Sequence, residues 1–230
     1  MRFVDLSRLI EQRTAVHPNH PPVIMSVWND HSMPYQLEGE TFTSKSLHLS
    51  FGDHVGTHVD APVHFSAAAD AASVDQIPLE DFYTEAVCLD LSHKPLKSLI
   101  SVEELIEAEK RAGVAIKPRD TVLIYMEFYK RTWGTKAFLH DFPGIAEDGV
   151  RWLGSKGIVA FGVEAVSVGI EGAQNMRVHR LCGEIGITHY ECLVNLDQLV
   201  GKGRFRFIAF PLKLKGGSAS PVRAVALLDE

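Results

Sequence analysis

The alternation of apolar and polar residues predicts where this chain forms strands. In residues 46–51 the side chains of Leu47, Leu49 and Phe51 fall on one side, and serine and histidine side chains fall on the other. This is the period of a half-buried strand. Further candidate strands carry longer apolar runs, at residues 86–91, 121–126, 157–163, 204–210 and 222–228. The turn-rich residues between the last two predict that these strands pair as a hairpin.

Three segments carry helical signals. Residues 101–113 begin with a capping box, in which Ser101 is followed three positions later by Glu104. Residues 143–157 and 188–203 are predicted as the second and third helices. Strands outnumber helices and alternate with them in the middle of the chain, which predicts an α/β or α+β fold.

The segment from residue 13 to residue 40 is rich in proline, histidine and asparagine. Proline removes a backbone donor and restricts the residue before it, so we expect an ordered but irregular segment and no helix. Long loops in compact proteins are often functional. The histidines here, His17, His20 and His31, are interpreted as surface residues on a segment that could approach a site.

The composition is that of an ordinary globular protein, with 46% hydrophobic and 23% charged residues. We expect one domain over residues 1–230. The net charge is −6 and the lysines and arginines are scattered, which argues against a nucleic-acid partner and against an anionic membrane surface. No stretch approaches the roughly 20 apolar residues of a membrane span. The three cysteines form no CxxC pair and the N-terminus carries no secretory signal, so we expect a cytoplasmic protein.

The stretch HVGTHVDAPVHF, residues 54–65, concentrates chemistry-bearing side chains. Pro62 excludes a helix interior, and in an extended chain side chains of equal parity point the same way. Gly56 could let the backbone bend so that neighbouring imidazoles converge. Three histidines and one aspartate share the even parity, and they are His54, His58, Asp60 and His64.

Two imidazoles and one carboxylate are a common ligand set for Zn²⁺, Mn²⁺ or Fe²⁺ with open coordination positions. His64 could be a further ligand or a general acid–base, since the unperturbed histidine pKa is about 6.5. The alternative is an ordinary strand whose histidines are satisfied by hydrogen bonds. Four such groups on one face would be costly to bury unpaired, so a metal or catalytic site is favoured.

The same stretch resembles the HxGTHxDxPxHF signature of the cyclase-like metal-dependent hydrolases, a family that includes bacterial kynurenine formamidases and isatin hydrolases. Residues 142–158, 191–199 and 207–227 also resemble segments of that family. The resemblance implies a single mixed-sheet swivelling β/β/α domain. It also implies a homodimer or homotetramer.

By this resemblance His54, His58 and Asp60 hold one divalent metal ion, Zn²⁺ or Mn²⁺, and His64 donates and accepts protons. The implied reaction is hydrolysis of a small amide, formamide, lactam or lactone by metal-activated water. Arylformamidase activity is one option. A biosynthetic cyclase-type member and a non-catalytic metal-binding protein are the alternatives.

In two-metal members Asp60 would bridge to a second ion, which a later histidine and glutamate twelve residues apart complete. His179 and Glu191 have that spacing here. His189 is a competing interpretation, either as the ligand or as a hydrogen-bonding neighbour. Whether one ion or two is bound stays open.

The chain departs from the family pattern in residues 162–172, where Glu164 and Gly169 occupy positions at which aspartates are common. These positions lie near the substrate pocket in the family, so the departure bears on the substrate. Trp28 is a weaker candidate for stacking on a flat substrate, and packing is the alternative role.

Overall fold

The computed structural model describes residues 1–229, and its frame is a nine-stranded mixed sheet with the order β1-β15-β13-β7-β9-β11-β12-β6-β14. The four strands β7, β9, β11 and β12 run parallel, and the strands that flank them pair antiparallel. The bounds are β1 (Arg2–Asp5), β6 (His58–Asp60), β7 (Tyr83–Asp90), β9 (Thr121–Tyr125), β11 (Ala160–Val163), β12 (Thr188–Glu191), β13 (Phe205–Ile208), β14 (Ala219–Pro221) and β15 (Val225–Leu228). The predicted α/β fold is confirmed.

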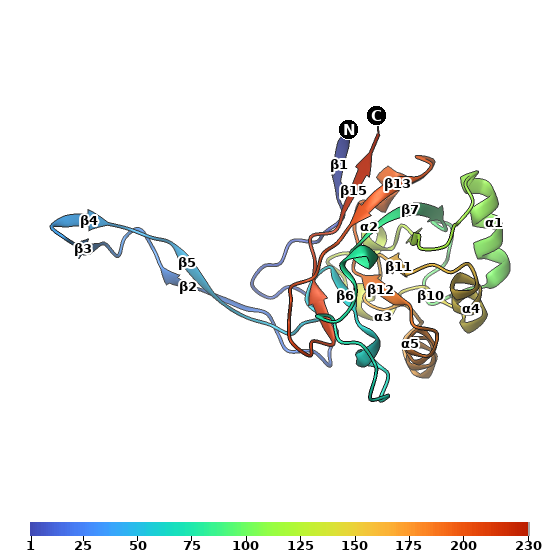
Figure 1. Ribbon diagram of the computed structural model, residues 1–230, viewed down its shortest axis with the longest axis horizontal. Coiled ribbons are helices and arrows are strands. Elements are labelled where there is room, and N and C mark those ends of the chain that lie inside the picture. Colours follow the sequence, from blue (N-terminus) through green and yellow to red (C-terminus); the bar gives the residue numbers. More distant parts are fainter. Residues whose placement is uncertain (230) are drawn as a thin grey trace.

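The helices α1 (Val102–Ala112), α4 (Glu147–Ser155) and α5 (Ala173–Ile185) lie together on the side of the sheet away from the protruding arm (Figure 1). Alternate residues of the central strands divide between two cores. Val122 and Ile124 of β9 pack on the helical side, whereas Leu123 packs in the cluster on the other face. Each face of a central strand is therefore buried, which explains the continuous apolar runs in the sequence.

Shorter elements complete the fold. The helices α2 (Phe128–Thr132) and α3 (Ala137–His140) follow β9, and β8 (Leu99–Ile100) pairs with β10 (Gly144–Ile145). Single turns of 3-10 helix occur at Pro62–His64, Leu79–Phe82 and Leu196–Leu199. Within residues 1–229, no helix is both long and apolar enough to cross a lipid bilayer.

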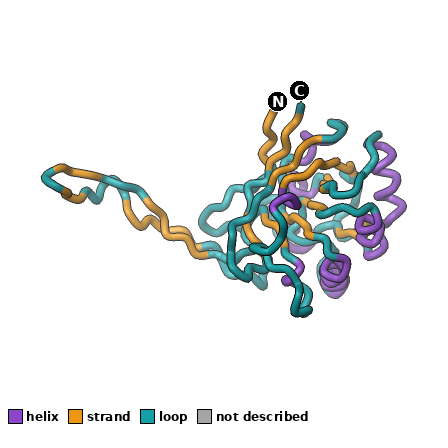
Figure 2. The backbone as a smooth tube through the Cα atoms, in the orientation of Figure 1, coloured by secondary structure: helices purple, strands orange, loops and turns teal. Residues whose placement is uncertain are grey.

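A two-stranded arm leaves the body between residues 23 and 51 (Figures 1 and 2). Its inner part pairs β2 (Ile24–Asn29) with β5 (Ser46–Ser50), and its tip pairs β3 (Tyr35–Leu37) with β4 (Glu40–Phe42). The strand predicted at 46–51 is confirmed, but its predicted burial is wrong. Leu47 and Leu49 are 48% and 49% exposed because the arm stands clear of the body.

The segment 13–40 contains no helix, as predicted, but it is less irregular than expected because β2 and β3 lie within it. The helix predicted at 188–203 is wrong. Residues Thr188–Glu191 form β12, which is held between β11 and β6 and is fully buried. The sheet environment overrides the helical pattern of the sequence here. The last long helix is instead α5, which the sequence pattern did not predict.

The other predicted helices are confirmed in α1 and α4. Ser101 and Glu104 form the capping box of α1, and Gly113 ends that helix with a φ of 68°. Strands β13 and β15 pair antiparallel, as the predicted hairpin requires. Their connection is longer than a turn, because it carries β14 across to pair with β6.

Candidate active site

The stretch 54–64 is built from a turn, a short strand and a 3-10 turn. Gly56 has a φ of 63°, and a Cβ at this position would lie 2.9 Å from Cγ1 of Ile10. Only β6, His58–Asp60, is extended. The four even-numbered polar groups do converge, but parity accounts only for His58 and Asp60. The bend at Gly56 brings His54 to them, and the turn Pro62–His64 brings His64.

Strands β6 and β12 place their polar side chains on one face. The antiparallel register pairs His189 with Asp60 and Glu191 with His58. Between them Val59 pairs with Tyr190, and both of these side chains pack in the apolar core of the opposite face. Two neighbouring strands thus present two imidazoles and two carboxylates side by side.

The first cluster joins His54, His58 and Asp60, all of which are buried. His54 Nδ1 lies 2.9 Å and His58 Nε2 lies 3.4 Å from Oδ1 of Asp60. Ligand atoms that share one tetrahedral zinc ion are about 3.3 Å apart, given bond lengths of about 2.0–2.1 Å. The spacing of these atoms is therefore suitable for a common ion.

The second cluster joins Asp60 to His179, His189 and Glu191. His179 Nε2 is 3.4 Å from Oε1 of Glu191, and His189 Nε2 is 3.1 Å from Oδ2 of Asp60. Helix α5 supplies His179, and β12 supplies the other two residues. The structure thus brings both His179 and His189 to Asp60 and Glu191, although the sequence reasoning treated them as alternatives.

Backbone carbonyls orient two of the imidazoles. Nδ1 of His58 lies 2.9 Å from the carbonyl oxygen of Gly56, and Nδ1 of His179 lies 2.9 Å from that of Asn175. A carbonyl can only accept a hydrogen bond, so Nδ1 carries the proton in each ring. In the neutral ring Nε2 then presents a lone pair toward the carboxylates. This is the usual orientation of a metal-ligating histidine.

Several atoms of the cluster have no hydrogen-bond partner although they are buried. They are His58 Nε2, Asp60 Oδ1, His189 Nδ1 and Glu191 Oε1. Buried polar atoms are normally satisfied, and lone pairs that face each other need a cation between them. The residues present therefore fit a divalent metal ion.

The pKa shifts of the cluster also indicate buried carboxylates that are ionised and neighbouring imidazoles that balance their charge. Burial raises the pKa of the Asp60 carboxyl, but His189, His54 and His58 lower it, and the net pKa lies well below its usual range. Burial lowers the pKa of His58, but Asp60 and Glu191 raise it, and the net pKa lies well above its usual range. The carboxylates therefore stay ionised and attract a cation.

His64 differs from the other three groups of its stretch. Its side chain is 21% exposed, and Nε2 lies 3.8 Å from Oδ2 of Asp60, beyond hydrogen-bond distance. Burial, together with His54 and His179, lowers the pKa of His64 to about 4, although Asp60 acts in the opposite direction. At neutral pH the ring is uncharged and able to accept a proton.

A cavity of about 590 Å³ opens above both clusters. One wall is the segment Ala15–His20, and the other carries Val166, Ser167 and Met176. Val166 and Ser167 belong to the segment 162–172, which the family resemblance placed near the substrate pocket, whereas Met176 was not predicted because no motif marks it. Glu164 is not among the residues that line the cavity. It turns into the core, where the backbone N–H groups of Met126 and Phe128 donate to its Oε2 at 2.7 and 3.2 Å.

Two aromatic side chains differ from expectation. His20, interpreted as a surface residue, is half-buried, and its ring stacks on that of His54 with centroids 4.5 Å apart. The proline-rich segment therefore does reach the site. Trp28 lies on β2 of the arm, is 70% exposed, and does not line the cavity of its own chain.

Comparisons with known proteins identify a family and relatives of this chain. The model of the Cyclase family, described as "Putative cyclase", matches residues 4–169. A kynurenine formamidase from Salinibacter ruber is 29% identical over 230 residues, covering 98% of this chain and 97% of that protein.

Solved structures are similar over almost the whole chain. Isatin hydrolase A from Ralstonia solanacearum superposes with a TM-score of 0.84 at 30% identity, covering 99% of this chain and 92% of that one. A structure described as a predicted metal-dependent hydrolase from Bacillus stearothermophilus superposes with a TM-score of 0.70 at 25% identity, covering 98% and 97%. These matches confirm the fold that the resemblance implied.

Proposed function

The chain belongs to the Cyclase family, and from this premise we propose that it is a metal-dependent hydrolase that opens a small amide, formamide, lactam or lactone. One observation carries the proposal. Two ligand clusters share Asp60, contain buried atoms without hydrogen-bond partners, and form the floor of an open cavity. A closed structural metal site would have no such cavity above it.

His54, His58 and Asp60 would hold one ion. Asp60, His179, His189 and Glu191 would hold a second ion, and Asp60 would then belong to both sites. Zn²⁺ and Mn²⁺ both suit this set of nitrogen and oxygen ligands. When bound, the ion would polarise the substrate carbonyl and lower the pKa of water toward neutrality.

His64 is the general acid–base of this proposal. It stands at the border between the clusters and the cavity, and its ring is neutral at pH 7, so its free nitrogen can take a proton from water. The protonated ring can then pass the proton to the leaving nitrogen or oxygen. The Asp60 carboxylate nearby stabilises the imidazolium while it exists.

The class of substrate follows from the cavity and the relatives. A volume of about 590 Å³ admits a bicyclic or substituted aromatic molecule. Kynurenine formamidase and isatin hydrolase are named for an aryl formamide and a cyclic aryl amide. We extend this substrate class to the present chain. We also propose that residues 1–230 form one domain, and that the protein is a cytoplasmic homodimer or homotetramer.

The test is a substrate panel assayed with the purified protein loaded with Zn²⁺ or Mn²⁺ in turn. The panel contains N-formyl aromatic amines, isatin-like lactams and small lactones. Turnover of at least one class with metal, and none after chelation, is expected. Metal binding without turnover of any class would favour a non-catalytic metal protein instead.

His64→Ala tests the acid–base assignment. We expect turnover to fall by about 10²- to 10⁴-fold, while the metal content measured by elemental analysis stays at the wild-type level. The matched control is His93→Ala, because the His93 side chain is 58% exposed on the surface. Full activity of the His64 variant would remove this residue from the mechanism.

A further inference from the structure

Glu191 is the residue of the second cluster that the sheet supports least. It is the last residue of β12, and the pairing of this strand with β11 has already ended at Tyr190 and Gly162. Glu191 therefore pairs on one side only, with His58 of β6. His189, two residues earlier, pairs with a neighbouring strand on both sides. The end of a strand is less constrained than its interior, so another feature must fix the Glu191 carboxylate.

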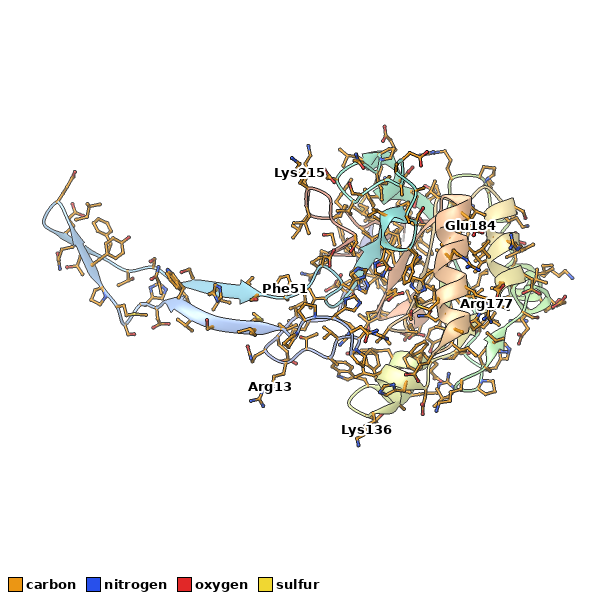
Figure 3. The ribbon with its side chains drawn as sticks, turned by 90° about the horizontal axis from the view of Figure 1, so that it is seen from below. Arg13, Phe51, Lys136, Arg177, Glu184 and Lys215 are labelled. Atoms are coloured by element: carbon orange, nitrogen blue, oxygen red, sulfur yellow. The ribbon has the colours of Figure 1, made fainter. Side chains whose placement is uncertain are left out.

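His179 of the same cluster is fixed by helix α5. The helix has Arg177 and Glu184 on its exposed surface (Figure 3), whereas His179 is buried. Nδ1 of its imidazole lies 2.9 Å from the carbonyl oxygen of Asn175, one turn earlier. The helix thus holds this ring against the place where the Glu191 carboxylate must lie.

Cys192, the residue after Glu191, has an unusual backbone conformation. Its φ is 58°, in the left-handed region. Seven non-glycine residues within 1–229 have a positive φ, and Cys192 is the only one of them that is buried. Such a conformation costs free energy and persists only where the surroundings enforce it. The neighbours of Cys192 must therefore supply that constraint.

The left-handed turn changes the direction of the chain immediately after Glu191. Strand alternation would place Cys192 on the same face as Tyr190, in the core away from the site. Cys192 instead packs on the helical side of the sheet and lines the cavity. Its N–H donates to the carbonyl oxygen of Ala165 at 2.8 Å. The turn at Cys192 therefore ends β12 and sets the orientation of its last residue, Glu191.

The hydroxyl of Thr57 holds this turn. The register of β6 and β12 ends with His58 and Glu191, so the pair that would follow is Thr57 with Cys192. Oγ1 of Thr57 donates to the carbonyl oxygen of Cys192 at 2.7 Å and accepts from the N–H of Arg8 at 2.9 Å. The hydroxyl has a single proton, which is therefore directed at Cys192. Thr57 is 1% exposed, so water does not compete for this bond.

We propose that Thr57 is a positioning residue for the second metal ion. Its hydroxyl holds Cys192 in the left-handed conformation, and the turn at Cys192 directs the Glu191 carboxylate toward His179. The inference rests on the proposed metal sites, although Thr57 belongs to neither cluster. The first cluster does not include Glu191, so loss of the hydroxyl should weaken the second ion selectively.

Thr57→Val tests the proposal, because valine keeps the branched shape of threonine and removes the hydroxyl. The chelated protein is titrated with Zn²⁺ by isothermal titration calorimetry, and Glu191→Gln identifies which binding event belongs to the second cluster. Thr57→Val should lower the affinity for that ion by about 10- to 100-fold and change the affinity for the other by less than about threefold. Thr57→Ser, which keeps a hydroxyl, should restore the second ion.

The matched control is Thr132→Val. The Thr132 hydroxyl is also buried and also donates to a backbone carbonyl oxygen, that of Phe128 at 2.7 Å, but it lies on α2 and in neither cluster. This variant should keep the wild-type affinity for both ions, and circular dichroism checks that all variants are folded. Equal loss of the second ion in Thr57→Val and Thr132→Val would refute a specific role of Thr57.

Two variants of Cys192 test the link through the turn and leave Thr57 available. A β-branched residue disfavours a positive φ, so Cys192→Val should weaken the second ion selectively. Glycine adopts a positive φ without steric cost, so in a Cys192→Gly background Thr57→Val should cost at most about threefold in affinity. Retention of the second ion in Cys192→Val, or an undiminished effect of Thr57→Val beside Gly, would overturn the proposal.

The stoichiometry of wild type is a further test, since a protein that binds one ion per chain would also refute the proposal. The titration contains no substrate. A protein that binds two ions in the expected manner but turns over no member of the substrate panel would therefore contradict the hydrolase proposal and support the role of Thr57.

Discussion

Asp60 is the residue on which both metal clusters depend. One of its carboxylate oxygens faces His54 and His58, and the other faces His189. No other described side chain belongs to both clusters. Asp60 is buried, with 3% of its surface exposed at the cavity floor, so its charge must be balanced by the imidazoles or by a cation.

Asp60→Ala is therefore expected to abolish metal binding at both clusters. Elemental analysis after dialysis should find less than a tenth of the metal present in wild type. Asp70→Ala, at an exposed aspartate ten positions along the chain, is the control and should keep its metal. Metal retained at the wild-type level in the Asp60 variant would disprove the ligand assignment.

Glu164 makes the stability of the protein depend on pH. Burial raises its pKa to about 7, although the N–H groups of Met126 and Phe128 act against burial. Because the folded state holds the proton more tightly than the unfolded state, the contribution of this group is present below the unfolded pKa of 4.5 and is lost as the pH rises through about 7.

Glu164→Gln removes this titration. Relative to wild type, the free energy of unfolding of the variant should increase by about 2 to 3 kcal/mol between pH 5 and pH 8. Urea unfolding at the two pH values measures the change. The exposed Glu80, changed to glutamine, should show no such trend. A difference between Glu164→Gln and wild type that does not vary with pH would contradict the shifted pKa.

At the scale of elements, α1 begins with the capping box that its sequence predicts. Ser101 Oγ accepts from the N–H of Glu104, and the Glu104 carboxylate accepts from the N–H of Ser101 at 2.9 Å. Lys94 Nζ also binds that carboxylate at 2.8 Å, so the cap is tied to the loop after β7. The cap therefore fixes both the start of the helix and its position against the sheet.

Ser101→Ala should lower the free energy of unfolding by about 1 kcal/mol, since an N-terminal N–H loses its acceptor. Thermal or urea unfolding measures this loss. Ser155→Ala, at an exposed serine at the end of α4, should cost less than half as much. Equal losses in the two variants would mean that the capping box adds no stability of its own.

The helices and strands differ in how well the sequence predicts them. The central strands and α1 were predictable because their signals are local, a continuous apolar run or a cap. Strand β12 was not, because THYE carries no strand pattern and is extended only through pairing with β11 and β6. The burial of β5 was mispredicted because alternation shows that a strand has an apolar face, and does not show whether the fold of the chain covers that face.

Some residues of the candidate site could likewise be predicted from local sequence patterns, and others could not. His58 and Asp60 followed from strand parity, whereas the positions of His54 and His64 depend on the turns at Gly56 and Pro62. His179 and Glu191 came only from the family resemblance. Distance along the chain separates them from β6, and no local pattern links α5 to β12. In the cavity wall, Val166 belongs to a segment that only the family resemblance placed near the pocket, and Met176 has no signal in the sequence.

At the scale of the whole molecule, the proposed metal would be coupled to the fold. The candidate ligands come from β6, β12, α5 and the turn before β6, so a bound ion would connect segments that are far apart in the described chain. Without the ion, the buried carboxylates of Asp60 and Glu191 have only the neighbouring imidazoles to balance their charge. A ligand that binds only the folded state stabilises it by mass action.

Chelation should therefore lower the melting temperature as well as the activity. A free metal concentration 1,000-fold above the dissociation constant corresponds to about 4 kcal/mol and to a shift on the order of 10 °C. Differential scanning calorimetry before and after dialysis against a chelator measures it, and re-addition of Zn²⁺ or Mn²⁺ should restore the original value. An unchanged melting temperature after verified metal loss would contradict the coupling.

The register of β6 against β12 limits how this sequence can change by insertion and deletion. A single residue gained or lost within β6 would exchange His58 and Asp60 for Val59 on the site face, and one gained or lost within β12 would exchange His189 and Glu191 for Tyr190. The tip of the arm between β2 and β5 has no such constraint, because no ligand lies in it. Length variants are therefore expected to accumulate in residues 30–45, whereas residues 58–60 and 188–191 should keep a fixed length.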